Sequence, residues 1–221
     1  MPHRLKHPVE AVIFDMDGTL HDSEVIYTAA QRGASAAMGI EITEAFWHTL
    51  IGIPAIEGSA MLRAHMGAGF DYDVFERHYH HHRETGFAAG IPVKPGAHDL
   101  LDHLDRRGMP YAIATSADRR MAEQHLGLSG LRPRFEVVVT RDDVTRGKPH
   151  PDPFLRAAER IGANPARCLA IEDSINGIRA AHAAGMMAVM VPDIVQPCDH
   201  TRTICAAVAT DLHEVLRMLQ G

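Results

Sequence analysis

The stretch VEAVIFDMDGTL, from Val9 to Leu20, decides the fold of this chain. Its apolar half ends at once in acidic residues and a glycine, which is typical of a buried strand leading into a functional loop. Similar short apolar runs follow at Tyr111–Ala114, Val137–Val139, Cys168–Ile171 and Met187–Val191. Helical patterns separate them at Arg119–Leu126, Pro153–Ile161 and Ile175–Ala184. The alternation predicts an α/β fold, a doubly wound parallel sheet with helices on both faces.

A long segment without a convincing strand separates the first two runs. Residues 22–92 have helical periodicity and are too many for a simple connection, so we expect a small inserted α-helical domain there. The core domain is then built from residues 1–21 and 93–221 and closes with an amphipathic helix at Asp211–Leu219. A length of 221 residues suits one domain with such an insertion.

Composition excludes several classes of protein. Hydrophobic residues make up 46% and charged residues 23% of the chain, as in ordinary globular proteins. The formal charge of -6 lacks the basic footprint of a nucleic-acid binder, and no apolar run reaches the length of a membrane helix. The first residues do not resemble a signal peptide, and the three cysteines suit reduced thiols. We expect a cytoplasmic protein without nucleic-acid or membrane partners, present as a monomer or weak homodimer.

Acidic residues follow two of the predicted strands, where ligands bind in parallel sheets. Asp15 and Asp17 leave the first strand, and one of them can attack a substrate while the other handles protons. Glu172 and Asp173 follow the fourth strand. Carboxylates facing one another repel unless a cation lies between them, and hard divalent cations prefer oxygen ligands, which makes Mg²⁺ the natural candidate.

The residues that follow the second and third predicted strands include groups that can bind an anion. Thr115 and Ser116 offer hydroxyls and backbone amides ahead of a helix. Lys148 lies in the proline-rich sequence GKPHPDP. A carboxylate approaching a phosphate dianion at about 4 Å is opposed by roughly 8 kcal/mol at an effective dielectric of ~20. Mg²⁺ and Lys148 would cancel this repulsion, which points to phosphoryl transfer with a carboxylate nucleophile.

The motifs DMDGTL, Thr115-Ser116, GKPHPDP and EDSINGI together resemble the haloacid dehalogenase superfamily, in particular its phosphatases with a helical cap. The resemblance implies that Asp15 forms an aspartyl-phosphate, and that Asp17 protonates the leaving oxygen and then activates water. It also implies Mg²⁺ ligation by Asp15, Asp173 and the Asp17 main-chain carbonyl, with Glu172 as a direct or water-mediated partner. The implied enzyme is a phosphoric monoester hydrolase acting on a small phosphorylated metabolite such as a sugar phosphate.

Several branches of this superfamily have residues that this sequence lacks, or lack residues that it has. These differences reduce the number of reactions that fit the sequence. True dehalogenases lack an acid at the position of Asp17, and phosphonoacetaldehyde hydrolases need a cap lysine that residues 22–92 do not contain. Beta-phosphoglucomutases typically have a histidine where Tyr27 stands and an arginine in the loop that here reads Gly52-Ile53-Pro54-Ala55. A phosphomutase therefore stays the alternative, and a non-catalytic phosphate-binding protein is a further one. A signalling receiver domain would need neither Asp17 nor the cap.

Selectivity for the leaving group is expected to come from the cap. Arg63, Arg77 and Arg83 could meet a carboxylate or a second phosphate, although a solvated helix face is the favoured explanation of each. The run from His78 to His82 lacks an acidic or cysteine partner at zinc-site spacing, so we interpret it as a polar helix surface. His21 and His150 lie next to the motifs, with supporting or exposed roles expected.

Overall fold

The computed structural model describes residues 5, 7–50 and 55–220, and it divides the chain into two compact units. Unit 1 contains Met1–Ser23 and Ile91–Gly221, and unit 2 contains Glu24–Gly90. Each unit has its own apolar core. In the described part of the chain, no helix is long and apolar enough to cross a membrane.

Unit 1 is built around a parallel sheet, which confirms the predicted fold class. Over the described residues the sheet has six strands in the order β3-β2-β1-β4-β5-β6, and every pairing is parallel. The strands are β1 (Ala11–Phe14), β2 (Tyr111–Ala114), β3 (Val138–Val139), β4 (Cys168–Glu172), β5 (Met187–Met190) and β6 (Ala207–Val208). The order reverses between β1 and β4, and ligands bind at such reversals in open parallel sheets.

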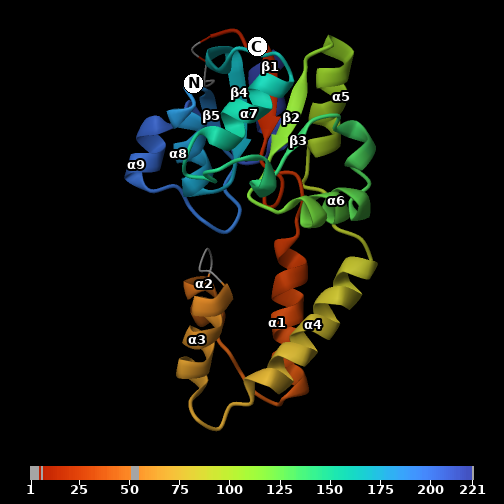
Figure 1. Cartoon of the computed structure of the whole chain (residues 1–221), viewed down its shortest axis with the longest axis vertical. Helices are drawn as coiled ribbons and strands as arrows, with labels where there is room; N and C mark the ends of the chain where they lie inside the picture. The colour runs from red at the N-terminus through yellow and green to blue at the C-terminus, as the bar shows by residue number, and fades with distance from the viewer. Residues whose placement is uncertain (1–4, 6, 51–54, 221) are drawn as a thin grey trace. The chain divides into compact units, whose positions relative to one another are not determined.

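Helices cover both faces of the sheet (Figure 1). One face packs against α5 (Ala97–Arg107), α6 (Arg119–Leu128) and α10 (Leu212–Gln220). The other packs against α7 (Asp152–Arg160) and α8 (Ile175–Ala183), with the end of α9 (Asp199–Ile204) beside them. Strand β1 serves both cores, because Val12 and Phe14 point to one face and Ala11 and Ile13 to the other. This double burial explains its uninterrupted apolar run.

Among the α-helices and strands of unit 1, the sequence analysis missed three, namely α5, α9 and β6, and several ends shift by one or two residues. Helix α5 begins after Gly96 and ends before Gly108, both with positive φ, and its apolar stripe contains Leu100, Leu101 and Leu104. Strand β6 has only two residues and forms by pairing with β5. Strand β1 begins at Ala11 rather than Val9, because the ladder with β4 starts there.

A partly buried carboxylate, that of Asp143, connects the end of β3 to two helices. Asp143 closes the short 3-10 turn η2 (Arg141–Asp143) and accepts hydrogen bonds from the backbone amide and hydroxyl of Thr140, each 2.8 Å long. Arg119 of α6 and Arg160 of α7 also donate to it, at 2.5 and 2.7 Å. Burial would raise the pKa of Asp143, but the Thr140 and arginine hydrogen bonds outweigh it and hold the pKa below its usual range.

Replacing this carboxylate should therefore destabilise unit 1. We expect Asp143→Ala to lower the free energy of unfolding by roughly 3 kcal/mol at pH 7, because its charge-assisted hydrogen bonds are lost together. The folded-state pKa is depressed, so this stabilisation is present above the unfolded pKa and disappears as pH falls. Urea unfolding should show the gap between wild type and variant shrinking below about pH 4. A gap as large at pH 3 as at pH 7 would contradict this account.

Unit 2 consists of four helices over its described residues. They are α1 (Glu24–Ala37), α2 (Glu44–Thr49), α3 (Ala55–Met66) and α4 (Tyr72–Ala88). Its core contains Ala34, Ile42, Leu62 and Phe75. Helices α1 and α4 approach closely, since a Cβ on Gly33 would lie 2.7 Å from the ring of His82. His82 is thus a packing residue of α4 rather than part of a fully exposed surface.

The chain leaves and re-enters unit 1 through neighbouring residues. The amide of Asp22 donates to the carbonyl of Pro92 at 2.8 Å, and the amide of Lys94 donates to the carbonyl of Leu20 at 2.9 Å. The Lys94 ammonium group also bonds the Asp22 carboxylate at 3.0 Å. These contacts fasten the two crossing segments to each other within unit 1.

Candidate active site

Three carboxylates meet where the strand order reverses. Asp15 follows β1, Glu172 ends the neighbouring strand β4, and Asp173 follows it. The amide of Asp15 donates to the carbonyl of Ile171 at 2.9 Å and so continues the ladder to the start of the loop. One oxygen from each of the three carboxylates lies within 4.8 Å of the others. The sheet therefore brings together acidic residues that are far apart in the sequence.

Lys148 joins two of these carboxylates. Its ammonium nitrogen lies 2.5 Å from Asp15 Oδ1 and 2.7 Å from Glu172 Oε1, and its side chain is almost fully buried above the ring of Phe154. The second oxygen of Glu172 accepts a hydrogen bond from the amide of Ser174 at 2.7 Å. Both oxygens of Glu172 are thus engaged, and Glu172 fixes the position of the lysine.

The electrostatics of the cluster suit a divalent cation. Burial raises the pKa of Asp15 to about 7; Lys148 opposes this shift, while Glu172 and Asp17 add to it. Burial, followed by repulsion from Glu172 and Asp15, raises the pKa of Asp173 well above its usual range. Buried carboxylates that repel one another fit a hard cation, which relieves the repulsion and binds oxygen atoms. Asp15, Asp173 and Glu172 therefore offer a donor set of the kind that Mg²⁺ prefers.

Two glycines allow the site to be this compact. Gly18 has φ of +86°, and a Cβ there would collide with the carboxylate of Asp173. A Cβ on Gly177, in the first turn of α8, would overlap the carboxylate of Glu172. The glycines of DMDGTL and EDSINGI therefore make room for the acidic side chains of the site.

Besides Lys148, the predicted phosphate-binding residues are Thr115 and Ser116, which follow β2, the other neighbour of β1. Thr115 is buried, and its hydroxyl accepts a hydrogen bond from the amide of Ala117 at 3.0 Å. Ser116 is exposed. Asp118 caps α6 through a 2.7 Å bond from the amide of Met121. The structure thus puts Thr115 at the same edge of the sheet as Asp15 and leaves Ser116 at the surface.

The side chain of Asp17 belongs to a separate group of residues. Its Oδ1 lies 2.8 Å from His125 Nδ1, 3.0 Å from the Ser23 hydroxyl and 3.9 Å from His21 Nδ1. Burial would raise the pKa of Asp17, but the His125 hydrogen bond and the nearby His21 ring outweigh it and lower the pKa. The predicted metal contact of Asp17 involves its main-chain carbonyl and stays a prediction.

His125 was missed by the sequence analysis. It lies on the buried stripe of α6, between Ala122 and Leu126, where an apolar residue is usual. A histidine on such a stripe is the signal that could have identified it. His21 is completely buried, whereas His150 is exposed.

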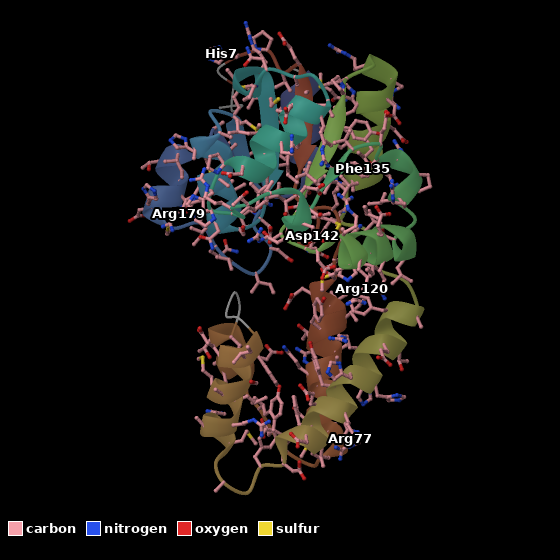
Figure 2. The ribbon with its side chains drawn as sticks, viewed as in Figure 1. His7, Arg77, Arg120, Phe135, Asp142 and Arg179 are labelled. Atoms are coloured by element: carbon pink, nitrogen blue, oxygen red, sulfur yellow. The ribbon has the colours of Figure 1, made fainter. Side chains whose placement is uncertain are left out.

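The candidate selectivity residues lie in unit 2. Arg63 pairs with Asp73 at 3.3 Å and covers the ring of Tyr72, and Arg83 lies over the ring of Tyr79. Arg77 extends from the exposed side of α4 (Figure 2). Tyr27 packs edge-on against Phe87. Residues 52–54 of the loop lie outside the described residues.

The chain is similar to known hydrolases and phosphatases. A family model described as haloacid dehalogenase-like hydrolase matches residues 9–185. A phosphorylated carbohydrates phosphatase of Thermotoga maritima is 33% identical over 80% of this chain and 82% of its own. Hexitol phosphatase A of Escherichia coli is 36% identical over 81% of each chain.

Solved structures show the same similarity. A haloacid dehalogenase family hydrolase of Deinococcus radiodurans with bound phosphate and sodium has a TM-score of 0.80 and 28% identity, covering 94% of this chain and 93% of its own. A Thermotoga maritima protein provisionally named a beta-phosphoglucomutase has a TM-score of 0.82 and 29% identity, over 96% and 99% of the two chains. The match to the family model spans well over half of the sequence. The chain therefore belongs to the haloacid dehalogenase-like hydrolase family.

Proposed function

We propose that this protein is a Mg²⁺-dependent phosphatase that hydrolyses a small phosphorylated metabolite, with a sugar or sugar-alcohol phosphate as the favoured class. The observation that carries the proposal is the buried group of Asp15, Lys148, Glu172 and Asp173 at the reversal of the strand order. Relatives named as phosphatases of phosphorylated carbohydrates and hexitols support this choice of substrate.

The proposed reaction has two steps at Asp15. An Asp15 carboxylate oxygen attacks phosphorus while the bond between phosphorus and the leaving oxygen breaks, and Asp17 gives that oxygen a proton. Water then attacks phosphorus, Asp17 takes a proton from the water, and the bond to Asp15 breaks. Asp15, Asp173 and the main-chain carbonyl of Asp17, with Glu172 nearby, would hold Mg²⁺, and the bound ion would supply positive charge that offsets the charge of the phosphate.

The other residues of the chain have supporting roles in this proposal. Lys148 keeps Asp15 ionised as a nucleophile and adds positive charge beside the phosphate. The Thr115 hydroxyl and the amide of Ser116 hold phosphate oxygens. The helical segment 22–92 acts as a cap that excludes water and selects the leaving group.

Phosphate release from a panel of phosphorylated compounds tests the proposal. The panel contains sugar phosphates, sugar-alcohol phosphates, nucleotides and phosphoglycolate, each with Mg²⁺ or with EDTA. We expect release from one class of compound, a fall to background with EDTA, and recovery when Mg²⁺ is added in excess.

Two other results would overturn it. Conversion of glucose 1-phosphate to the 6-phosphate after addition of a bisphosphate primer, without phosphate release, would establish the mutase instead. Binding of phosphate without turnover of any compound would establish a non-catalytic phosphate-binding protein.

A further inference from the structure

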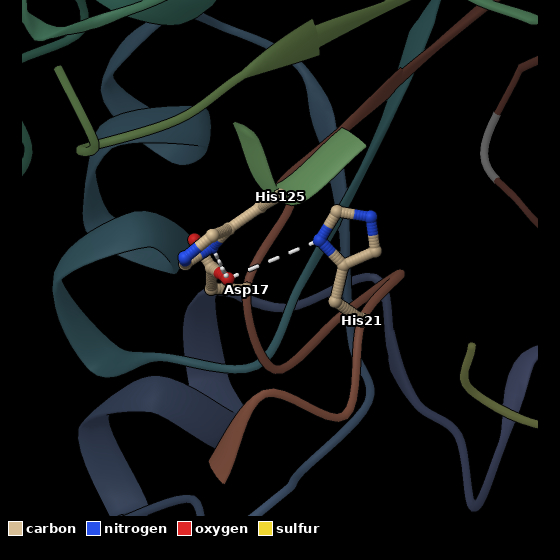
Figure 3. A group of neighbouring side chains, drawn as sticks. All are labelled: Asp17, His21 and His125. Carbon is tan, nitrogen blue, oxygen red and sulfur yellow. Dashed lines mark hydrogen bonds and ion pairs between the residues drawn. The ribbon is translucent and has the colours of Figure 1, made fainter. Parts of the chain in front are cut away.

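The carboxylate of Asp17 is held through one of its two oxygens. His125 Nδ1 and the Ser23 hydroxyl both bond Oδ1, and His21 Nδ1 faces the same atom (Figure 3). Among the described residues, no hydrogen bond or ion pair to Oδ2 is present. The Asp17 side chain is 31% exposed, whereas those of His21 and His125 are 0% and 4% exposed. One oxygen is therefore fixed by the protein, and the other is free to exchange a proton.

A second layer of contacts supports the histidines. His21 Nε2 lies 2.9 Å from the hydroxyl of Ser129, which also donates to the carbonyl of Leu126 at 3.1 Å. The rings of His21 and His125 meet edge to face, with centroids 6.4 Å apart. Ser129 is the C-cap of α6, so His125 and the partner of His21 lie on α6 and at its end. Side chains locked by such contacts hold a reacting group in a defined orientation.

Position 125 is a buried position of α6 that is occupied by a histidine. A histidine on the buried stripe of a helix loses hydration that an apolar residue would not lose. The hydrogen bond to Asp17 compensates for that loss. An apolar residue could fill the same space but could not hold the carboxylate.

We propose that His125 is a positioning residue: its hydrogen bond to Oδ1 fixes Asp17 so that Oδ2 exchanges the proton with the leaving oxygen and with water. The Ser23 hydroxyl bonds the same oxygen, and His21 Nδ1 faces it at 3.9 Å. This inference rests on the proposed role of Asp17 as the acid and base of a phosphatase. The arrangement follows the general pattern in which a third group orients the acid or base.

The test compares two leaving groups. An alkyl phosphate leaves as a strongly basic alkoxide that needs a proton, whereas p-nitrophenyl phosphate leaves as a weakly basic phenolate that does not. We expect His125→Leu to lower kcat/KM about 30-fold for the alkyl phosphate, within the range of general acid catalysis, and less than about threefold for p-nitrophenyl phosphate. The loss should appear in kcat rather than in KM.

Matched variants separate positioning from packing. His125→Asn keeps an N–H donor near the place of Nδ1 and should recover most of the alkyl phosphate activity. His103→Leu also removes a buried helical histidine of unit 1 and should leave both activities unchanged. If His125→Leu does not fold, Ser23→Ala removes the other hydrogen bond to Oδ1 and should show the same dependence on leaving group with a smaller effect.

Asp17→Asn distinguishes failure of the inference from failure of the proposed function. If this variant keeps full alkyl phosphate activity, the proposed acid is wrong. If it loses that activity while His125→Leu keeps it, only the positioning inference is wrong. In the Asp17→Asn background, His125→Leu should cause no further loss.

Two further outcomes would overturn the inference. An equal loss on both substrates in His125→Leu would indicate general damage to the site. Binding of one Zn²⁺ per chain at saturating Mg²⁺, lost in His125→Leu and kept in Asp173→Asn, would make Asp17, His21 and His125 a metal site instead.

Discussion

Asp15→Asn is expected to release phosphate at least about 10⁴-fold more slowly than the wild-type protein, because loss of a nucleophile removes the covalent route. The amide keeps the size of the side chain but is a poor nucleophile. It also lacks the charge that pairs with Lys148 at 2.5 Å. The same substitution should abolish the covalent intermediate.

Rapid quenching in acid followed by mass spectrometry measures that intermediate directly. A phosphorylated peptide containing Asp15 should accumulate in the wild-type protein during turnover and be absent from Asp15→Asn. Asp99→Asn removes an exposed carboxylate of α5 and is the matched control, with unchanged release expected. Phosphate on another residue, or normal turnover by Asp15→Asn, would refute Asp15 as the nucleophile.

Lys148→Met is expected to damage both activity and stability. Methionine is apolar and of similar length, so Asp15 and Glu172 would face each other without the cation that now lies between them. Removing one partner of a buried ion pair typically costs 3–5 kcal/mol, and we expect a loss of about 4 kcal/mol in the free energy of unfolding at pH 8. Phosphate release should fall at least about 10³-fold.

The pH dependence of this loss identifies its cause. Without Lys148, the folded-state pKa values of the carboxylates lie above their unfolded values, so the folded variant binds more protons and gains stability as pH falls. The deficit relative to wild type should therefore shrink between pH 8 and pH 5. A deficit independent of pH would indicate a packing defect.

Two further variants complete the comparison. Adding Glu172→Gln to Lys148→Met removes one of the facing charges and should recover stability without recovering activity. Lys94→Met also removes a lysine with two carboxylate partners, Asp22 and Asp193, but these side chains are 30% and 20% exposed. Its stability loss should be smaller, because partly hydrated charges depend less on their partner.

The sequence allowed the sheet to be predicted wherever a strand is buried on both faces. The strands β1 and β5 are continuous apolar runs for that reason, as is β4 up to its last residue, Glu172. Strand β6 could not be predicted, because two residues carry no periodic signal and the strand exists only through its pairing with β5. Helix α5 did carry a signal, since Gly96 and Gly108 bound an amphipathic pattern that the sequence analysis did not use.

Some residues of the candidate site could likewise be predicted from the sequence, and others could not. Residues that follow strands could be assigned to one edge of the sheet from topology alone, and the structure brings Asp15, Lys148, Glu172 and Asp173 together there. The double contact of Lys148 depends on side-chain packing, which strand order does not determine. His125 meets Asp17 across 108 positions of sequence from a helix face rather than a strand end. A search limited to residues that follow strands could not identify His125.

The segment that leaves unit 1, Leu20–Asp22, is hydrogen-bonded to the segment that returns to it, Pro92–Lys94. This arrangement affects how the sequence of such a protein can diverge. Because the outgoing and returning segments are bonded to each other, the distance between them is set by the core and not by the length of chain that joins them. A joining segment of another length or composition could be accommodated with little strain on the sheet, since domain insertion succeeds where the ends lie close together. The residues at the strand ends and the joining segment can therefore diverge separately, by point substitution in one case and by exchange of a whole segment in the other.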